Sequence, residues 1–241
     1  MQQRPDDDAD ASLLRRLLRE ARRLPVEFQT SIAFGVLVLG FLGFVAVAED
    51  VLEGEPNKFD SDLLLALRQA GNPDNPIGPA WLEYAMRDIT ALGGYAVLTL
   101  IVVLSTLYLL LESRIKTALL LVSSIISGTL LVSILKIGFD RPRPDLVDQL
   151  THATSSSFPS GHATSSALVY LTLSLLLAQA VRHRRLKLFL IASGVFIAIL
   201  VGCSRIYLGV HWPSDVIAGW GLGAAWAMIW WIVARRLDRQ R

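Results

Sequence analysis

The feature that most constrains this chain is a series of six apolar stretches, each about as long as a membrane-spanning helix. Such a helix needs about 20 largely apolar residues, because its backbone amides must all be paired within the segment. None of the six stretches contains Asp, Glu, Lys, Arg or His. They cover residues 28–48, 89–111, 117–135, 163–181, 188–203 and 216–234. We therefore predict an all-α, polytopic membrane protein with six transmembrane helices, which form a single membrane-embedded domain over residues 1–241.

The composition of the chain agrees with a membrane location. Charged residues make up 18% of the sequence, whereas an ordinary soluble domain has about 25%. Cys203 is the single cysteine. An intrachain disulfide and a cysteine-based zinc site are therefore excluded.

Basic residues are divided unequally between the two sides of the predicted membrane domain. Six spans place both chain ends on one side, and sixteen of the 23 Lys and Arg residues fall on that side. Cytoplasmic loops carry the excess of Lys and Arg in membrane proteins. We therefore predict a multi-pass protein of the cell (inner) membrane with both termini in the cytoplasm. The seven basic residues on the outer side are Lys58, Arg68, Arg87, Lys136, Arg141, Arg143 and Arg205.

Two segments outside the spans have recognisable patterns. Within the cytoplasmic residues 1–27, leucines at helical spacing form one face and arginines cover the rest, which predicts an amphipathic helix on the membrane surface. Residues 49–88 form the longest outer loop, and their apolar run at 63–67 fits a short helix lying on the membrane. Whether this loop gates a site stays open. The glycine-rich segment 219–223 is expected to be a close helix-packing surface.

Two outer loops, residues 136–162 and 204–215, hold most of the remaining reactive side chains. Lys136, Arg143 and Arg205 are cations on the side where the positive-inside bias disfavours them. Guanidinium and ammonium groups are complementary to phosphate. The segment 159–161, Pro-Ser-Gly before an apolar run, is typical of a helix start, whose free amides also favour an anion. We therefore predict an anion site where the two loops converge on the outer face.

Histidines in the same loops could act as a nucleophile and as a proton donor. A neutral imidazole can attack phosphorus, while a second, protonated one can give a proton to the departing oxygen. His211 lies four residues before Asp215, and if Pro213 opens the last helix, the carboxylate can accept from one ring nitrogen and leave the other free to attack. An aspartate helix cap beside an interfacial histidine explains this spacing equally well. His152 has no comparable partner in the sequence.

Other kinds of site are less compatible with these loops. The surplus of Arg and Lys makes a divalent cation electrostatically unfavourable, so we expect no metal and no cofactor. A serine nucleophile at Ser160, paired with His162, lacks the Gly-x-Ser-x-Gly turn that such sites use.

Three motifs in these loops resemble the signature motifs of the type 2 phosphatidic acid phosphatase superfamily. They are Lys136-x6-Arg143-Pro144, Pro159-Ser160-Gly161-His162 and Ser204-Arg205-x5-His211-x3-Asp215. All three are complete and in the family's order. The same anion pocket occurs in soluble vanadium-dependent haloperoxidases, but the six spans argue against that branch.

The resemblance implies a metal-independent phosphatase that acts through a phosphohistidine. It implies that His211 is the nucleophile, Asp215 its orienting partner and His162 the general acid. The residues that it implies for phosphate binding are Lys136, Arg143, Ser160, Gly161 and Arg205. Arg141, in the Arg141-Pro142 pair just before Arg143, could compete for the phosphate, although the family spacing selects Arg143.

The expected function is hydrolysis of a phosphate monoester or diphosphate on a membrane lipid, with the site on the periplasmic, or extracytoplasmic, face. Phosphatidylglycerophosphate, phosphatidic acid and undecaprenyl diphosphate all fit. One alternative is a phosphotransferase that uses a polyprenyl diphosphate donor. A lipid transporter is disfavoured, because transport paths usually require ionisable residues within the spans. The expected partners are the lipid substrate and the bilayer. Neither a nucleic acid nor an obligate protein partner is indicated, and the oligomeric state stays open.

Overall fold

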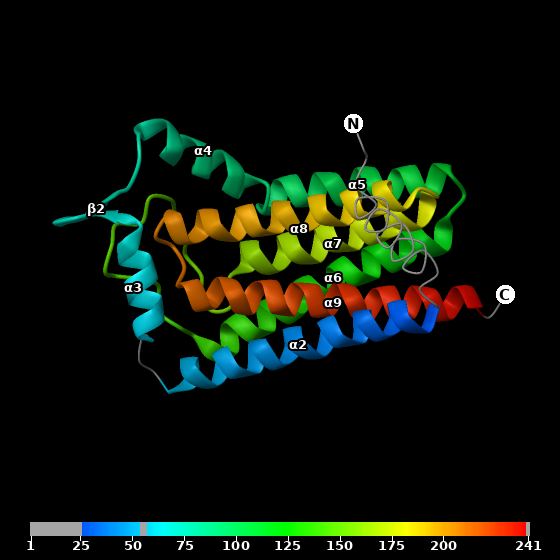
Figure 1. Ribbon diagram of the computed structural model, residues 1–241, viewed down its shortest axis with the longest axis horizontal. Coiled ribbons are helices and arrows are strands. Elements are labelled where there is room, and N and C mark those ends of the chain that lie inside the picture. Colours follow the sequence, from blue (N-terminus) through cyan, green and yellow to red (C-terminus); the bar gives the residue numbers. More distant parts are fainter. Residues whose placement is uncertain (1–25, 54–56, 240–241) are drawn as a thin grey trace, which may run out of the picture.

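The fold is a bundle of long helices with small elements at one end (Figure 1). The computed structural model describes residues 26–53 and 57–239. Residues 13–24, for which the leucine and arginine pattern predicts an amphipathic helix, lie outside the described part. The long helices are α2 (Val26–Leu52), α5 (Tyr95–Leu111), α6 (Ile115–Phe139), α7 (Gly161–Ala180), α8 (Arg184–Tyr207) and α9 (Pro213–Arg239). The small elements are α3 (Lys58–Ala66), α4 (Ala80–Ala91) and an antiparallel hairpin of β1 (Arg68–Gln69) and β2 (Asn72–Pro76).

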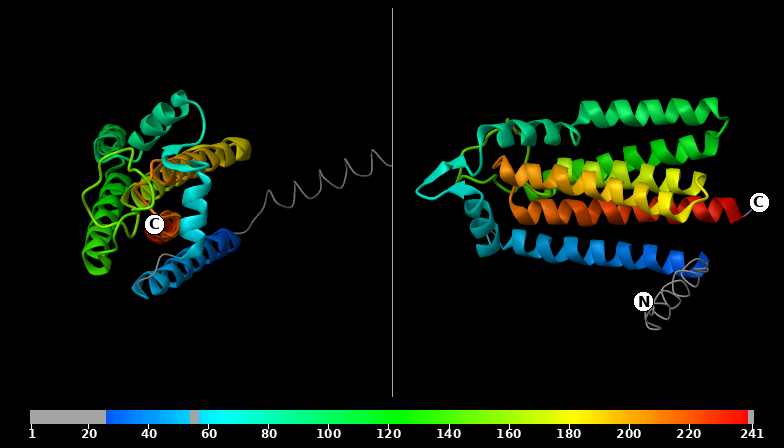
Figure 2. Two further views of the ribbon diagram at one scale, coloured as in Figure 1. Left: turned by 90° about the vertical axis from the view of Figure 1, so that its left-hand side faces the viewer. Right: turned by 45° about the horizontal axis from the view of Figure 1, so that its top comes forward.

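The prediction of an all-α membrane protein is confirmed. Among the described residues, five helices are long and apolar enough to cross a membrane, and the bent pair α4 and α5 would be a sixth span. Helix α2 begins and α9 ends at the same end of the bundle, while α3, α4 and the hairpin lie at the other (Figures 1 and 2). This arrangement gives the molecule two distinct ends, one of which carries the predicted motifs.

The prediction of one continuous helix over residues 89–111 is wrong. Helix α4 ends at Ala91, and residues 92–94 are not helical. Helix α5 begins at Tyr95 and is bent by 45° relative to α4. Glycine is a poor helix former, and Gly93 lies where no side chain fits. A Cβ atom there would lie 2.4 Å from Val201 Cγ1 and 3.2 Å from the His162 carbonyl oxygen. The break therefore lets the backbone pass close to a predicted site residue.

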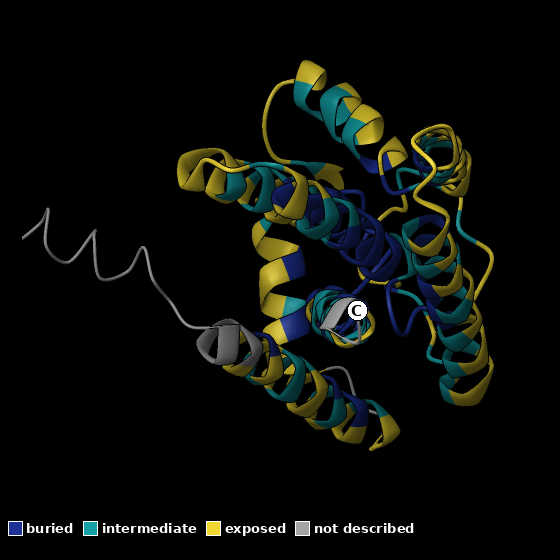
Figure 3. Cartoon of the chain, turned by 90° about the vertical axis from the view of Figure 1, so that its right-hand side faces the viewer, coloured by how far each residue is buried: buried dark blue, intermediate teal, exposed yellow. Residues whose placement is uncertain are grey.

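Helix α7 is the central element of the bundle. In the most apolar stretch of α7, 56% of the residues are buried, compared with 17% in the corresponding stretch of α2. Buried residues gather in the middle of the bundle, and exposed ones face outward (Figure 3). The glycine-rich segment of α9 packs closely, as predicted: a Cβ on Gly223 would lie 2.5 Å from the Thr164 carbonyl oxygen, and one on Gly221 would lie 2.8 Å from the Gly40 carbonyl oxygen.

The two motif-bearing loops are shorter than the sequence suggested, because the helices on either side continue into them. Lys136 lies in the last turn of α6, and Arg205 lies in the last turn of α8. His162 and Asp215 lie in the first turns of α7 and α9. The helix predicted around residues 63–67 is present as α3, whereas α4 and the hairpin were not anticipated. The charged side chains thus stand on helix ends that the packed bundle fixes.

Candidate active site

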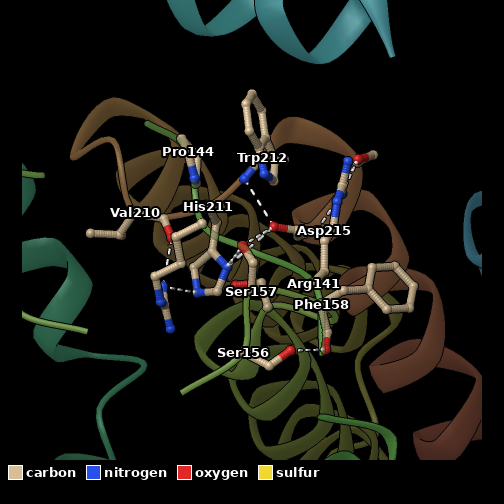
Figure 4. A network of polar contacts seen from close by, with 12 residues as sticks. Arg141, Pro144, Ser156, Ser157, Phe158, Val210, His211, Trp212 and Asp215 are labelled. Carbon is tan, nitrogen blue, oxygen red and sulfur yellow. Dashed lines mark hydrogen bonds and ion pairs between the residues drawn. The ribbon is translucent and has the colours of Figure 1, made fainter. Parts of the chain in front are cut away.

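His211 lies in the turn before α9, and its two ring nitrogens have different surroundings (Figure 4). The residue is 2% exposed. Nδ1 lies 3.4 Å from Ser157 Oγ and 3.5 Å from Asp215 Oδ2, whereas Nε2 lies 3.4 Å from Arg143 Nη1. A carboxylate beside Nδ1 favours the tautomer with the proton on Nδ1. The lone pair of Nε2 then faces the cationic side of the site.

Asp215 is fully buried, and several donors fix its carboxylate. Pro213 opens α9, as predicted, which puts Asp215 in the first helical turn. Its Oδ2 accepts from Ser157 Oγ (2.5 Å) and from the backbone amide of Trp212 (2.9 Å). The second bond is the helix-capping interaction that the sequence offered as an alternative to histidine orientation. Both interactions therefore occur together in this structure.

Three cations lie close to one another beside His211, with Arg143 at its Nε2, and neutral groups hold each of them. Lys136 Nζ donates to the Ser156 carbonyl oxygen (2.6 Å), and Arg143 donates to the carbonyl oxygens of Ser155 (2.9 Å) and Val210 (2.6 Å). Arg205, the third, donates to the hydroxyl of a threonine (3.1 Å). Among the residues that the structure describes, none of the three forms an ion pair. Their charges are oriented but not neutralised, as an anion site requires.

Two buried polar atoms beside these cations have no hydrogen-bond partner. They are Ser160 Oγ and Arg205 Nε, on residues that are 0% and 4% exposed. A buried polar group without a partner costs about 1–3 kcal/mol, which a bound oxyanion would recover. A Cβ on Gly161, the first residue of α7, would lie 3.4 Å from Lys136 Cε, so this helix start, where amides are left without helical partners, lies next to Lys136.

His162 occupies the second position of α7 and belongs to the same electrostatic cluster. It interacts with Arg205, His211, Lys136 and Arg143. The structure thus brings six motif residues into one cluster, with Ser160 and Gly161 at the start of α7 next to His162; the six are Lys136, Arg143, His162, Arg205, His211 and Asp215. It leaves His152 and His183 exposed and outside the cluster.

Burial and charge make His211 a weak base. Burial lowers its pKa from 6.5 to about 4, and the positive charges of Arg205 and Arg143 act in the same direction. The hydrogen bond and the charge of Asp215 oppose this shift. Burial also lowers the pKa of the Arg143 guanidinium, against the influence of Asp215. At neutral pH His211 is therefore uncharged, as a nitrogen nucleophile must be.

Comparison with known families agrees with this geometry. The family model described as the PAP2 superfamily matches residues 117–239, which include all three motifs. The chain belongs to the PAP2 superfamily. It is a multi-pass membrane protein and, as a member of this family with the relatives described below, a lipid phosphatase.

Individual PAP2 proteins resemble this chain to different extents. Phosphatidylglycerophosphatase B of Bacillus subtilis is 37% identical over 147 residues, which are 59% of this chain and 70% of that protein. An undecaprenyl-diphosphatase of Sulfolobus acidocaldarius is 42% identical over 71 residues, 30% of each chain. The crystal structure of a transmembrane PAP2-type phosphatidylglycerolphosphate phosphatase from Bacillus subtilis superposes with a TM-score of 0.73 at 30% identity, covering 85% of this chain and 98% of that one.

Four residues of this PAP2 site were missed or left undecided by the sequence. Ser157 bonds Asp215, but it stood within a polar stretch with no distinguishing pattern. Thr90 of α4 and Asp60 of α3 meet the site through Arg205 and Arg141, respectively. Arg141, which could have competed for the phosphate, is instead bound to two carboxylates.

Proposed function

We propose that this PAP2 protein removes the terminal phosphate of a membrane lipid through a phosphohistidine on His211, without a metal. The observation that carries the proposal is that the two ring nitrogens of His211 have different neighbours: Nδ1 faces Asp215, and Nε2 faces Arg143. In this arrangement Nε2 attacks phosphorus, the P–N bond forms, and the bond to the lipid oxygen breaks in line with it. Water then cleaves the P–N bond and releases inorganic phosphate.

The three cations would stabilise the transferring phosphoryl group. Lys136, Arg143 and Arg205 present donors to its equatorial oxygens, and the hydroxyl of Ser160 and the amide of Gly161 add two more. The three cations are already held in place by carbonyl and hydroxyl groups. Preorganised donors need little rearrangement as negative charge redistributes.

His162 is the proposed general acid. A phosphate dianion bound among the cations would offset their charge and so favour the protonated imidazole. The proton passes to the departing lipid oxygen, and the neutral imidazole then accepts a proton from the attacking water. Its place at the start of α7 supports this role. Burial, followed by the charges of Arg205 and its neighbours, lowers the pKa of His162 to about 3, so the role requires that the bound phosphate raise this pKa.

Phosphatidylglycerophosphate is the proposed substrate among the lipids considered. The relative that matches over 70% of its own length is named a phosphatidylglycerophosphatase, and so is the crystal structure that superposes with a TM-score of 0.73. A diphosphate substrate, or transfer to a lipid acceptor, is the second candidate. The similarity to an undecaprenyl-diphosphatase favours it, although only 30% of that chain is covered.

The proposal is tested by phosphate release from a panel of lipid phosphates in the presence of a chelator. We expect the wild type to act on phosphatidylglycerophosphate faster than on undecaprenyl diphosphate, and His211→Ala to lose activity by at least about 10³-fold. His152→Ala, an exposed histidine outside the cluster, is the matched control and should be unaffected. An acid-labile phosphoryl adduct should appear on the wild type but not on His211→Ala. Loss of activity with the chelator would refute the metal-free mechanism.

A different outcome identifies phosphoryl transfer. If a lipid acceptor gains phosphate while little inorganic phosphate appears, the protein is a phosphotransferase. The same panel, supplied with a polyprenyl diphosphate donor and read by mass spectrometry, separates the two functions.

We also propose that the site faces the periplasm or cell exterior. The uneven distribution of Lys and Arg supports this orientation. Nine of them belong to the α5–α6 and α7–α8 connections, with the helix starts that follow, and to the end of α9, which lie at the end of the bundle opposite to the site (Figure 1). The lipid tail would remain in the bilayer while the headgroup reaches the site.

A further inference from the structure

Arg141 lies beside the proposed nucleophile, yet its guanidinium is bound to two carboxylates. Nη1 donates to Asp215 Oδ1 (2.6 Å), and Nη2 donates to Asp60 Oδ2 (2.9 Å). Its side chain is 9% exposed, and both aspartates are fully buried. The guanidinium carbon also lies 5.6 Å from the centre of the Trp212 ring. These contacts engage Nη1 and Nη2 of Arg141 with the carboxylates, and Arg141 binds Asp215 at the oxygen that does not face His211.

Asp60 is connected to the start of α9 by more than this ion pair. Its Oδ1 accepts from the backbone amide of Ser214 (2.8 Å), and its Oδ2 accepts from the Ser214 hydroxyl (2.5 Å). Asp60 belongs to α3, which lies across the site end of the bundle (Figure 2). An acid that is buried to this degree is costly unless paired. The contacts therefore tie an outer helix to the helical turn that carries Asp215.

We infer that Asp60 and Arg141 are positioning residues of the phosphatase, forming with Asp215 a buried chain of alternating charges that orients His211 and compensates the positive charge its ring gains on phosphorylation. This inference rests on the proposed phosphohistidine mechanism. Arg141 fixes Oδ1 of Asp215, so that Oδ2 remains turned toward His211 Nδ1.

The charges of the chain make the role of Asp60 specific. Asp215 and Arg141 alone sum to zero, whereas Asp60 brings the total to one negative charge. A phosphorylated imidazole that keeps its Nδ1 proton carries a positive ring, which a net negative chain stabilises more than a neutral one. Asp60 would therefore lower the barrier to attack without touching the substrate.

The test is the Asp60→Asn variant, which keeps the shape of the side chain and removes its charge. We expect kcat to fall by about tenfold or more while KM changes little, since phosphate binding does not involve Asp60. Asp62→Asn, which changes an exposed aspartate of the same helix, is the matched control and should match the wild type. A raised KM with unchanged kcat, or activity equal to the control, would overturn the inference.

A double-mutant cycle separates positioning from general damage to the fold. If Asp60 acts through Asp215, adding Asp60→Asn to Asp215→Asn should cost little further activity. An additive loss would show that Asp60 acts by another route. If Asp60→Asn does not fold, Ser214→Ala removes one of the donors to Asp60 and should give a smaller fall in kcat in the same direction.

The pH dependence gives a readout that simple loosening of the site would not reproduce. Removing a negative charge in Asp60→Asn should lower the pKa of His211 and move the acid limb of kcat/KM down by roughly half a pH unit. Removing a positive charge in Arg141→Gln should move it up. Simple loosening of the site would instead move the acid limb of both variants to higher pH, toward the pKa of a solvated histidine. The charged groups that face His211 are Arg143 from the loop, His162 from α7, Arg205 from α8 and Asp215 from α9.

Failure of the inference is distinguishable from failure of the mechanism. If the wild type forms no adduct on His211, the phosphohistidine mechanism fails. If the wild type forms the adduct and Asp60→Asn forms it at the same rate, only the positioning role is wrong.

Discussion

At the scale of single residues, the surroundings of His211 determine the pH range in which it can act. Burial lowers the pKa of the ring from 6.5 to about 4, so the proposed nucleophile stays neutral until the solution is strongly acidic. We expect kcat/KM to fall as the pH drops through about 4, when His211 becomes protonated. The measurement is a pH–rate profile in detergent at fixed ionic strength, and an acid limb near 6.5 would contradict this prediction.

Thr90 provides a second prediction at this scale. Its hydroxyl accepts a hydrogen bond from Arg205, and it stands just before the break that separates α4 from α5. Thr90→Val has nearly the same shape but offers no acceptor, so the guanidinium loses its one hydrogen-bond anchor in the described structure. We expect KM and the vanadate inhibition constant to rise about fivefold, with a smaller effect on kcat. Thr106→Val is the control, since Thr106 bonds only within its own helix; equal effects in both variants would rule out a role for Thr90.

The contact between His211 and Asp215 could be predicted from their spacing in the sequence. His211 and Asp215 are one helical turn apart, so their contact follows from Pro213 opening α9. Asp60 and Thr90 could not be found in this way. Asp60 is 154 residues before its partner Ser214, and Thr90 is 115 residues before its partner Arg205, so these contacts arise only when the chain is folded.

At the scale of helices, the close contact between α2 and α9 provides a third prediction. A Cβ added to Gly40 would lie 2.6 Å from the Gly221 carbonyl oxygen, whereas one added to Gly43 would contact nothing within 4 Å. Replacing glycine by alanine within a helix normally stabilises the folded protein by up to about 1 kcal/mol. We therefore expect Gly43→Ala to keep or raise the melting temperature in detergent and Gly40→Ala to lower it. Equal melting temperatures would show that the two helices do not pack as described.

The helices themselves were largely predictable, because a run of apolar residues long enough to span a membrane has few other structures available. Their ends were not. Lys136 and Arg205 were assigned to loops because they are charged, yet both extend the helices that carry them. The break at Gly93 was also missed, since the apolar pattern continues through it while the packing against Val201 and His162 does not allow a straight helix with a side chain there.

At the scale of the whole molecule, the orientation in the membrane can be tested with introduced cysteines. Cys203 is the single native cysteine, so a Cys203→Ala background allows one label at a time. Asp74→Cys lies in β2 at the site end, and Arg184→Cys lies at the start of α8 at the other end. In intact cells an impermeant maleimide should label position 74 and reach position 184 only after permeabilisation. The reverse pattern would contradict the proposed orientation.

The break before α5 should also affect the surrounding lipid. With 17 residues, α5 provides about 26 Å of helix, whereas a typical hydrocarbon core is about 30 Å thick and its neighbour α6, with 25 residues, exceeds that length. A short span is accommodated by thinning of the bilayer, at a fraction of a kcal/mol for each Å of mismatch. The flank formed by α5 is therefore where the membrane should be thinnest, and the enzyme should be sensitive to the acyl-chain length of the lipids around it.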